Sequence, residues 1–290
     1  MLGFFRLEVV NIPLFGYFYL DGRSSREFGL QIALKENDDT THFGISRQNN
    51  IEMIPNSHKS YSMGSKLEPL VVPITMWSEK PLTRDTRIEM CNWLFQDDFL
   101  ELYTEEDQDV IYYCKIHGDS ERFLGIGRMG YVDLEMICDS PFAWSRPMVQ
   151  YFNLLKELSP TMPMPIPIRN DSNYKNWHDF IVKISIPSDT DTLLSDLEFK
   201  IWNKTTTTET DAFVISSALG SFPLQKGENL QIDMITGDIY TDVGLTSGEP
   251  YAHRRKNTNK KFIELNYGVN EIEFTGNCEL TIVTQFPVLK

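Results

Sequence analysis

The segment FYLDGRSSREFGLQIAL, which runs from Phe18 to Leu34, decides the fold of the first half of this chain. Tyr19 to Asp21 leads into Gly22-Arg23-Ser24-Ser25, a tetrapeptide rich in the residues that favour turns. Phe28 to Leu34 then restarts an extended apolar run. The segment is therefore predicted to be a strand, a turn and a second strand.

A longer hairpin is predicted after this segment. Residues 35–50 are mostly polar, which suits an exposed loop or the tip of a long hairpin. The hairpin itself is predicted from Ile51 to Trp77, with its turn within residues 51–66 and a β-rich return strand over residues 67–77.

One helix is predicted, over residues 82–95, and it is expected to cover one face of a sheet. The apolar residues at helical spacing are Ile88, Cys91 and Leu94 or Phe95. Thr86 and Glu89 form a capping-box pattern near its start. Strands are predicted to resume in residues 109–119 and 130–140.

The composition changes after Trp144. Residues 147–158 look helical, and the prolines at alternate positions that follow them favour an extended connector over residues 159–168. Beyond Trp177, strand-like runs recur at short intervals, which predicts a β-sandwich with turns at Thr236-Gly237-Asp238 and at Gly268. These runs are residues 180–186, 197–203, 211–217, 229–235, 238–243, 261–265, 270–276 and 278–286.

Length and composition limit the classes of function. The chain has 290 residues, enough for two domains of ordinary size, and its formal net charge of −14 at pH 7 repels a phosphate backbone, so affinity for nucleic acid is not expected. The cysteines are Cys91, Cys114, Cys138 and Cys278. They form no CxxC, so neither a zinc site nor a disulfide framework is predicted, and a reducing compartment fits.

A membrane or secretory segment is not predicted. Glu8 and Asn11 interrupt the apolar N-terminal run and no small-residue cleavage site follows, so this run is interpreted as strands rather than as a signal peptide. No apolar run approaches the ~18 to 20 residues of a membrane helix. A soluble protein is expected.

Catalysis has no support in the sequence, and no cofactor is predicted. Gly125 to Gly130, GIGRMG, satisfies GxGxxG, but a predicted strand follows it where a dinucleotide site needs a helix, which favours a glycine-rich β-turn. Asp133 and Glu135 share a strand face about 7 Å apart. They resemble the paired carboxylates of glycoside hydrolases, but an unaccompanied pair is more often a solvated strand face.

The histidines show no metal-binding spacing, so they are expected at the surface or in turns and no metal site is predicted. These residues are His42, His58, His117, His178 and His253.

Two features of the second half suit a surface for a partner or a sugar. The aromatic residues Trp177, Trp202, Tyr240 and Tyr251 could stack on sugar rings, although packing is their commoner fate. The basic cluster consists of His253, Arg254, Arg255 and Lys256 with Lys260 and Lys261. It could meet an acidic partner, although a solvated loop is the simpler interpretation. Trp202, Tyr240, Tyr251, Arg254 and Arg255 are the resulting candidates.

FYLDGRSSREFGLQI resembles the opening of the distal tail protein (Dit) family of long-tailed, non-contractile phages, and further segments resemble family motifs in the family's order. These segments are IEMIPNSHKSYSMG, IEMCNWLFQDDFLEL, DVIYYCKIHGD, GYVDLEMICDSPFAW, LQKGENLQIDMITGDIY and LNYGVNEIEFTG. The resemblance covers nearly the whole chain. It departs from the family at Pro55-Asn56, where Pro-Gly is usual, at Asp21-Gly22, which replaces Asn-Gly, and in the residues that precede the usual start.

The resemblance implies a mainly β protein in two domains. Residues 1–145 would form an N-terminal, β-sandwich-like ring domain with one helix. Residues 146–290 would form a C-terminal galectin-like β-sandwich, entered through the proline-rich connector at 159–168. The family builds hexameric rings at the distal end of the tail, so a structural and not an enzymatic role in the virion is implied, with assembly in the host cytoplasm.

The implied partners follow from that place in the virion. They are other copies of the chain in a homohexamer, the major tail or tube protein, a tail-associated lysin or tail fibre protein, and receptor-binding proteins. Sequence-specific nucleic acid and membrane insertion are not implied. With no room for an inserted carbohydrate module, the second domain is expected to dock proteins. The alternative is a lectin-type module that binds host cell-wall carbohydrate.

Ring closure would use a head-to-tail contact between neighbouring copies. We expect Ile51 to Lys66 at that contact, in particular Ile54, Pro55, Tyr61 and Gly64. The net charge of −14 adds a hypothesis, that carboxylates line the ring and keep DNA from adhering as it passes.

Overall fold

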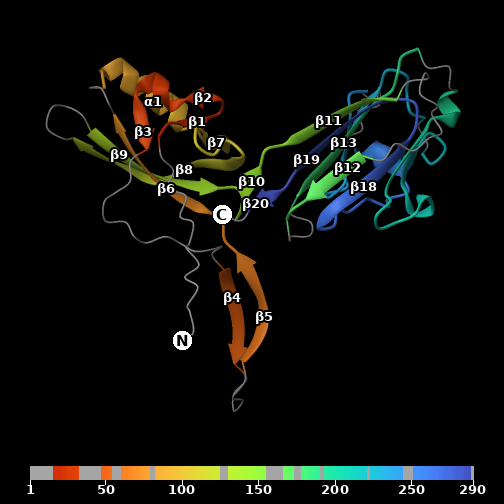
Figure 1. Ribbon diagram of the computed structural model, residues 1–290, viewed down its shortest axis with the longest axis horizontal. Coiled ribbons are helices and arrows are strands. Elements are labelled where there is room, and N and C mark those ends of the chain that lie inside the picture. Colours follow the sequence, from red (N-terminus) through yellow and green to blue (C-terminus); the bar gives the residue numbers. More distant parts are fainter. Residues whose placement is uncertain are drawn as a thin grey trace, which may run out of the picture. The chain divides into compact units, whose positions relative to one another are not determined.

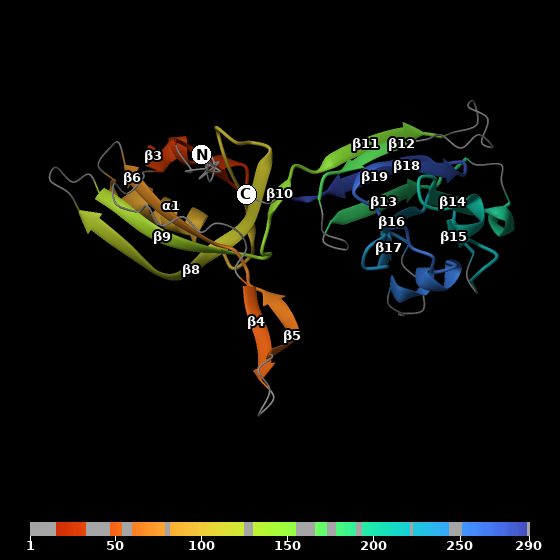
Figure 2. The same ribbon diagram turned by 60° about the horizontal axis from the view of Figure 1, so that its bottom comes forward.

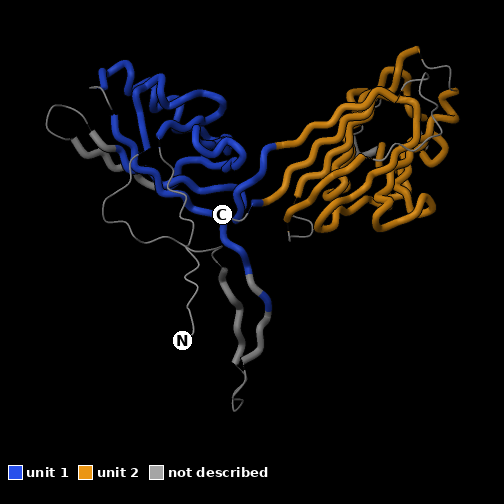
Figure 3. The backbone as a smooth tube through the Cα atoms, in the orientation of Figure 1, with its two compact units in different colours: residues 1–146, 288–290 blue, residues 147–287 orange. Residues whose placement is uncertain are grey.

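A computed structural model describes residues 16–32, 47–53, 60–78, 82–124, 130–154, 166–172, 178–189, 193–220, 223–243 and 251–288. Side chains are not described at 47–53, 60–63, 65, 118–124, 130, 131 and 251–253. The chain forms two compact units, residues 1–146 with 288–290 and residues 147–287 (Figure 3). In the described part, no helix is long and apolar enough to span a bilayer.

The first unit is built on a nine-stranded antiparallel sheet (Figure 1). Its strands are β1 (Phe18–Leu20), β2 (Arg23–Ser24), β3 (Leu30–Ile32), β6 (Val71–Ser78), β7 (Leu100–Thr104), β8 (Val110–Leu124), β9 (Gly130–Cys138), β10 (Ala143–Ser145) and β20 (Pro287–Val288). The main order is β2-β1-β7-β8-β9-β6-β3, while β10 pairs with β8 and β20. The mainly β fold is as predicted.

The opening segment does form a strand, a turn and a strand, but β1 and β3 lie at different ends of the sheet order. A 3-10 turn, η1 (Ser25–Phe28), separates them and ends at Gly29, whose φ of 64° is easily reached by glycine. The Ile32 amide donates to the Gly16 carbonyl at 2.9 Å. Because Gly16 directly precedes β1, this bridge curls the sheet back toward its own start.

The predicted helix is present as α1 (Arg84–Leu94), over one face of the sheet (Figure 2). Its N-cap is Thr83, whose hydroxyl accepts from the Thr86 amide at 3.2 Å, so the predicted Thr86–Glu89 box is not the cap. The buried face is Met90, Trp93 and Leu94. Of the residues predicted to form this face, only Leu94 lies on it, since Ile88, Cys91 and Phe95 are exposed.

Trp93 decides which face of α1 is buried. Its indole stacks on Phe18 and Phe28 with ring centroids 5.6 and 5.0 Å away, and its Nε1 donates to the Leu20 carbonyl at 3.0 Å. These contacts join the helix to β1 and η1, which lie far from it in sequence. The alternative apolar stripe through Ile88 has no such partners in the core.

The second hairpin differs from its prediction. β4 (Arg47–Met53) pairs with β5 (Ser60–Leu67) in a two-stranded sheet of its own, whereas the predicted return strand is β6, in the large sheet. Strand β5, most of which was predicted to be the turn, is therefore one of the two strands of the hairpin. Of the polar stretch 35–50, residues 47–50 belong to β4 and the rest lies outside the described residues.

The second unit is a two-sheet antiparallel sandwich (Figure 2), as the sequence predicts for this half. One sheet has the order β11-β19-β13-β16-β17 and the other β12-β18-β14-β15. The bounds are β11 (Met148–Asn153), β12 (Ile166–Asn170), β13 (Asp179–Ser185), β14 (Glu198–Asn203), β15 (Phe213–Ser216), β16 (Asn229–Asp233), β17 (Ile239–Thr241), β18 (Gly268–Thr275) and β19 (Glu279–Gln285). The 3-10 turns are η2 (Leu194–Asp196), η3 (Glu209–Asp211) and η4 (Tyr251–Asn257).

Three predictions about the strands of the sandwich are wrong. The helical-looking stretch from 147 begins with strand β11, and residues 261–265 form no strand. The proline run is not wholly a connector, since Ile166 to Asn170 form β12. Pro167 is tolerated because β12 is an edge strand, and its apolar neighbours Ile166 and Ile168 alternate into the core.

Of the two turns predicted in the sandwich, the one at Thr236-Gly237-Asp238 is present. Gly237, with φ of 74°, lies between β16 and β17 and donates its amide to the Asp233 carbonyl at 2.9 Å. The Asp233 carboxylate also accepts from the Ile235 and Thr236 amides, which fixes the turn. Gly268, with φ of 94°, is instead the first residue of strand β18 and pairs with Asn170, so the turn predicted there is wrong.

Candidate functional site

Two of the four predicted ring-interface residues, Tyr61 and Gly64, lie in strand β5 of the β4–β5 hairpin. Ile54 and Pro55 fall outside the described residues. Tyr61 lies in β5 opposite Glu52, and its side chain is not described. Gly64 is exposed at φ of 106°.

Gly64 marks an irregularity in the hairpin. Asn49 pairs with Ser65 whereas Ile51 pairs with Ser62, so two residues of β5 oppose one residue of β4. This is the count of a β-bulge, which increases local twist and often requires a glycine. No heavy atom lies within 4 Å of a Cβ placed on Gly64, so a substitution there is opposed by its φ alone.

The aromatic candidates of the sandwich do not gather on one described surface. Trp202 is a correction to the predicted partner or sugar surface, because it is only 4% exposed. Tyr240 is 52% exposed on the edge strand β17, and the side chain of Tyr251 is not described. Trp177 falls outside the described residues. Burial of Trp202 removes one of the rings on which the sugar-binding hypothesis depends.

Arg254 is also a correction, because it is 3% exposed and serves the interior. Its Nε donates to Glu228 Oε1 at 2.7 Å and its Nη2 to Glu228 Oε2 at 2.8 Å, which makes a two-point ion pair. Glu228 is fully buried and also accepts from Thr241 Oγ1 at 2.7 Å and from the Gln225 amide at 2.8 Å. Both charges are thus paired and hydrogen-bonded, as burial requires.

Glu228 is a residue that reasoning from the sequence missed. It precedes β16, whereas Arg254 lies in η4, so no local spacing relates them. The available signal was the Gly-Glu pair of the segment LQKGENLQID, in which Gly227 has φ of 76°. Through this pair η4 is fixed to the start of β16 and, through Thr241, to β17.

The rest of the basic cluster is divided. Arg255 and Lys256 are exposed, so Arg255 remains a candidate residue for contact with a partner. Lys261 pairs with Asp211 at 3.2 Å, and Lys260 is exposed with φ of 60°. His253 has no described side chain. The cluster therefore offers less free positive charge than its sequence indicates.

The acidic pair and the glycine motif suit structural roles. Asp133 accepts from Thr75 Oγ1 at 2.7 Å across β9 and β6, and Glu135 is exposed opposite His117. Residues 125–129 are not described, but β8 ends at Leu124 and β9 begins at Gly130, opposite each other. A strand on each side does not provide the helix N-terminus that a dinucleotide loop needs.

The histidine prediction is wrong at one position. His178 is 2% exposed and lies 5.7 Å from the Phe286 ring, whereas His117 is exposed. His42 and His58 fall outside the described residues. Within the ranges the structure describes, three or more His, Cys, Asp or Glu side chains nowhere converge as a metal site would require.

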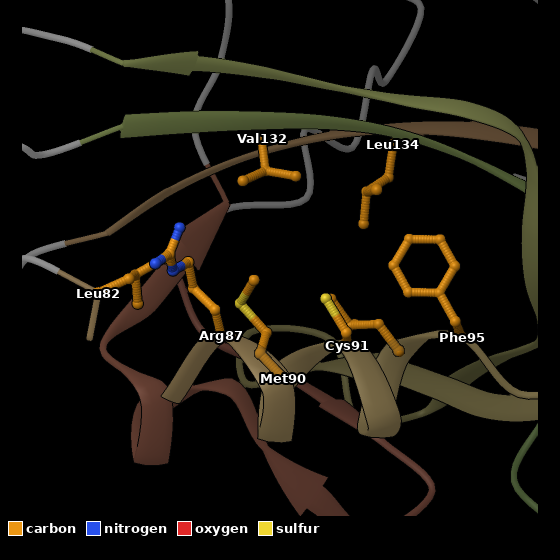
Figure 4. A pocket seen from close by; sticks show the side chains of 8 residues that line it. Leu82, Arg87, Met90, Cys91, Phe95, Val132 and Leu134 are labelled. Carbon is orange, nitrogen blue, oxygen red and sulfur yellow. The ribbon is translucent and has the colours of Figure 1, made fainter. Parts of the chain in front are cut away.

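An apolar groove of about 120 Å³ lies between α1 and β9 (Figure 4). Figure 4 shows Met90, Cys91 and Phe95 of the helix side facing Val132 and Leu134 of the sheet. Arg87 is its one charged lining residue. With this lining the groove is suited to apolar packing rather than to acid–base chemistry.

Three of the cysteine thiols are buried, and burial raises their pKa values. The pKa of Cys138 is raised to about 12, mainly by desolvation, and that of Cys114 is also raised well above its ordinary value. Burial likewise raises the pKa of the Cys278 thiol. At neutral pH these groups are protonated, apolar parts of the two cores.

Residues 15–140 match the family described as phage tail protein N-terminal domain. The whole chain is similar in fold to the Dit protein (gp 19.1) of phage SPP1, a structure described as a paradigm of the hub adsorption apparatus of phages that infect Gram-positive bacteria. The TM-score is 0.59 at 13% identity, over 94% of this chain and 99% of that chain. No curated protein matches this chain in sequence.

A second similar fold is found in the baseplate of phage P2 in its activated conformation. The structure with calcium gives a TM-score of 0.50 and the one with strontium 0.51, each at 11% identity over 94% of this chain and 98% of that chain. Residues 15–140 therefore resemble a phage tail protein N-terminal domain. The predicted resemblance to the distal tail protein family is confirmed in fold.

Proposed function

We propose that this chain forms a hexameric hub at the distal end of a phage tail, which joins the tail tube to the tail-tip proteins and lets DNA pass. The function would be carried by assembly and not by catalysis. The likeness of the first unit to phage tail domains and of the chain to SPP1 Dit supports this role. The partners proposed are the tube protein, a tail-associated lysin or fibre protein, and receptor-binding proteins.

The observation that carries the ring is the isolated hairpin. Among the residues that the structure describes, β4 and β5 pair only with each other and make no ladder to the nine-stranded sheet (Figure 1). A lone two-stranded sheet is marginally stable in water, so such a hairpin is expected to be covered by another chain. If each copy covers the hairpin of the next, the contact is head-to-tail and a rotation closes it into a ring.

Passage of DNA rests on charge. The net charge of −14 on each copy would give a ring with a strong negative field, which repels phosphate. The proposal requires carboxylates at the lumen, so a ring whose lumen is neutral or basic would contradict it.

The test is absolute mass by light scattering over a concentration series. A monomer has a mass of 33.6 kDa, and a ring is expected to have about six times that mass. Electron microscopy of the heavy species should show a six-fold ring with a central opening. A mass that stays at the monomer value at all concentrations, alone and with the tube protein added, contradicts the proposal.

A binding experiment separates the docking role of the second unit from the alternative lectin. A stable complex with a tail-fibre or receptor-binding protein supports docking. Saturable binding to purified host cell-wall glycan, abolished by Tyr240→Ala, would instead support a sugar site on the sandwich. Tyr240 is chosen because, among the aromatic candidates whose side chains are described, it is exposed.

A further inference from the structure

Cys114 and Cys138 lie directly opposite each other on the neighbouring strands β8 and β9. Residues that are directly opposite in a sheet point to the same face. Both side chains face the core of the first unit, with exposures of 0% and 1%. Both are free thiols in the structure.

The backbone hydrogen bonds define which kind of pair this is. The Asp139 amide donates to the Tyr113 carbonyl at 2.9 Å, while the Cys138 amide donates to Leu70 on the other side of β9 at 2.8 Å. The ladder bond to β8 thus joins the residue before Cys114 to the residue after Cys138. The two cysteines form a non-hydrogen-bonded pair, whose Cα atoms approach to about 4.5 Å in antiparallel sheets.

That spacing falls within the Cα range of disulfides, about 4.4 to 6.8 Å. Cys114 Sγ now donates to Met136 Sδ at 3.7 Å. Because Met136 is two residues before Cys138 on the same face, a rotation about the Cα–Cβ bond of Cys114 can turn its sulfur from one to the other without moving the backbone. Cys278, the other buried cysteine, lies in the other unit and belongs to its core.

We propose that Cys114 and Cys138 form a latent cross-strand disulfide, made by a small peroxide once the protein is outside a reducing compartment. One thiolate attacks a peroxide oxygen, the O–O bond breaks, and a sulfenic acid and water form. The second sulfur then attacks the sulfenic sulfur, the S–O bond breaks and a second water leaves. Two thiols are oxidised to one disulfide and one hydrogen peroxide is reduced to two waters.

The buried environment of Cys114 and Cys138 explains why both are thiols in the newly folded protein and why the disulfide would form slowly. The thiolate is the reactive form, and burial raises the pKa values of both thiols, so little thiolate exists at neutral pH. The bridge would join two central strands of the sheet and close a loop of about 25 residues, which restricts the unfolded chain. The proposal does not depend on the ring, since both cysteines belong to one chain.

The test uses the full chain with Cys91→Ser, which removes the exposed thiol. Folded protein is treated with hydrogen peroxide, and intact mass and a non-reducing peptide map are recorded. The expected result is the loss of two hydrogen atoms and a linked pair of peptides from β8 and β9. The rate of disulfide formation in the folded protein should rise about tenfold per pH unit between about pH 7 and 9. In the unfolded chain the rate should level off above about pH 8.5, the ordinary pKa of a thiol.

Cys278 is the internal control, because it is buried with no cysteine opposite it and should stay outside any bridge. Cys91→Ser with Cys138→Ala should lose the linked peptides. The proposal is overturned if the folded Cys91→Ser protein keeps both thiols, measured by labelling after unfolding, or if each is oxidised to a separate sulfinic acid. Since Cys91→Ser changes an exposed position, this outcome can be measured even if the variant with Cys138→Ala does not fold.

Discussion

Glu228 and Arg254 show what a single buried residue does in this sandwich. Glu228→Gln keeps the shape of the side chain but removes its charge, which leaves the Arg254 guanidinium buried and unbalanced. We expect a loss of ~3–5 kcal/mol in the free energy of unfolding of the second unit. Chemical denaturation followed by tryptophan fluorescence measures this loss.

A matched control for Glu228 is the exposed pair of Asp211 and Lys261, whose side chains are 60% and 50% exposed. Asp211→Asn should change stability little, because solvent screens the pair. Pairing Glu228→Gln with Arg254→Met should recover part of the loss, since the unbalanced charge is then gone. A loss from Glu228→Gln no larger than that from Asp211→Asn would show that the ion pair is not needed.

The buried thiols predict how stability depends on pH. The pKa of Cys278 is raised in the folded protein, so above the ordinary thiol pKa of about 8.5 the unfolded chain loses a proton that the folded chain keeps. Its contribution is complete below that pH and falls as pH rises, by ~1.4 kcal/mol per pH unit. Denaturation between about pH 8 and 10.5 should show a shallower slope for Cys278→Ala than for the wild type.

The control for Cys278→Ala is Ile282→Val, which also removes side-chain volume from the same core but involves no titrating group. It should lower the free energy of unfolding by ~0.5–1.5 kcal/mol at every pH and leave the slope unchanged. If Cys278→Ala and Ile282→Val gave equal slopes, the raised thiol pKa would be contradicted.

At the scale of the element, helix α1 offers two apolar faces on one sequence. Trp93→Ala should cost ~3–5 kcal/mol in the stability of the first unit, because it removes two ring contacts and leaves the Leu20 carbonyl without its donor. Ile88→Ala, on the same helix at 51% exposure, should change stability by no more than ~0.5 kcal/mol. Thermal unfolding of both variants by circular dichroism decides between the faces. Equal effects would show that the packing of α1 is not as described.

The same helix shows where prediction from sequence reaches its limit. Its existence follows from spacing, but Ile88 and Met90 are both apolar, and the choice between their faces is made by Phe18 and Phe28, which are distant in sequence. In β12, alternate prolines correctly exclude a helix, yet Pro167 is allowed in a strand only because no neighbour needs its amide. Local patterns thus identify elements, while tertiary partners decide their faces and edges.

In the candidate site too, local patterns indicate some features, while tertiary partners decide others. The hairpin backbone and the exposure of Tyr240 and Arg255 are compatible with what the sequence indicates. The burial of Trp202 and Arg254 could not be read locally, because it depends on a sheet register and on Glu228. At the scale of the whole molecule, the order of several loose motifs was a better guide than any one residue, since the Dit-like fold that this order predicted is confirmed.

The last prediction concerns assembly of the whole molecule through the hairpin. Gly64→Val places a branched side chain at φ of 106°, which strains β5 by ~1–3 kcal/mol and leaves the nine-stranded sheet untouched. Because the same contact recurs around a ring, the concentration at which the heavy species forms should rise at least about fivefold. Light scattering measures the shift.

Gly22→Val is the matched control, since Gly22 also has a positive φ, of 73°, with no atom within 4 Å of an added Cβ, but it lies in the β1–β2 turn. Both variants carry similar backbone strain, but that of Gly22→Val falls on the nine-stranded sheet, so a loss of stability in the first unit as the cause would weaken assembly most in Gly22→Val. If the hairpin is the ring contact, only Gly64→Val shifts assembly, although Gly22→Val strains the nine-stranded sheet and lowers its thermal stability more. Equal assembly in both would place the contact between copies on a surface other than the hairpin.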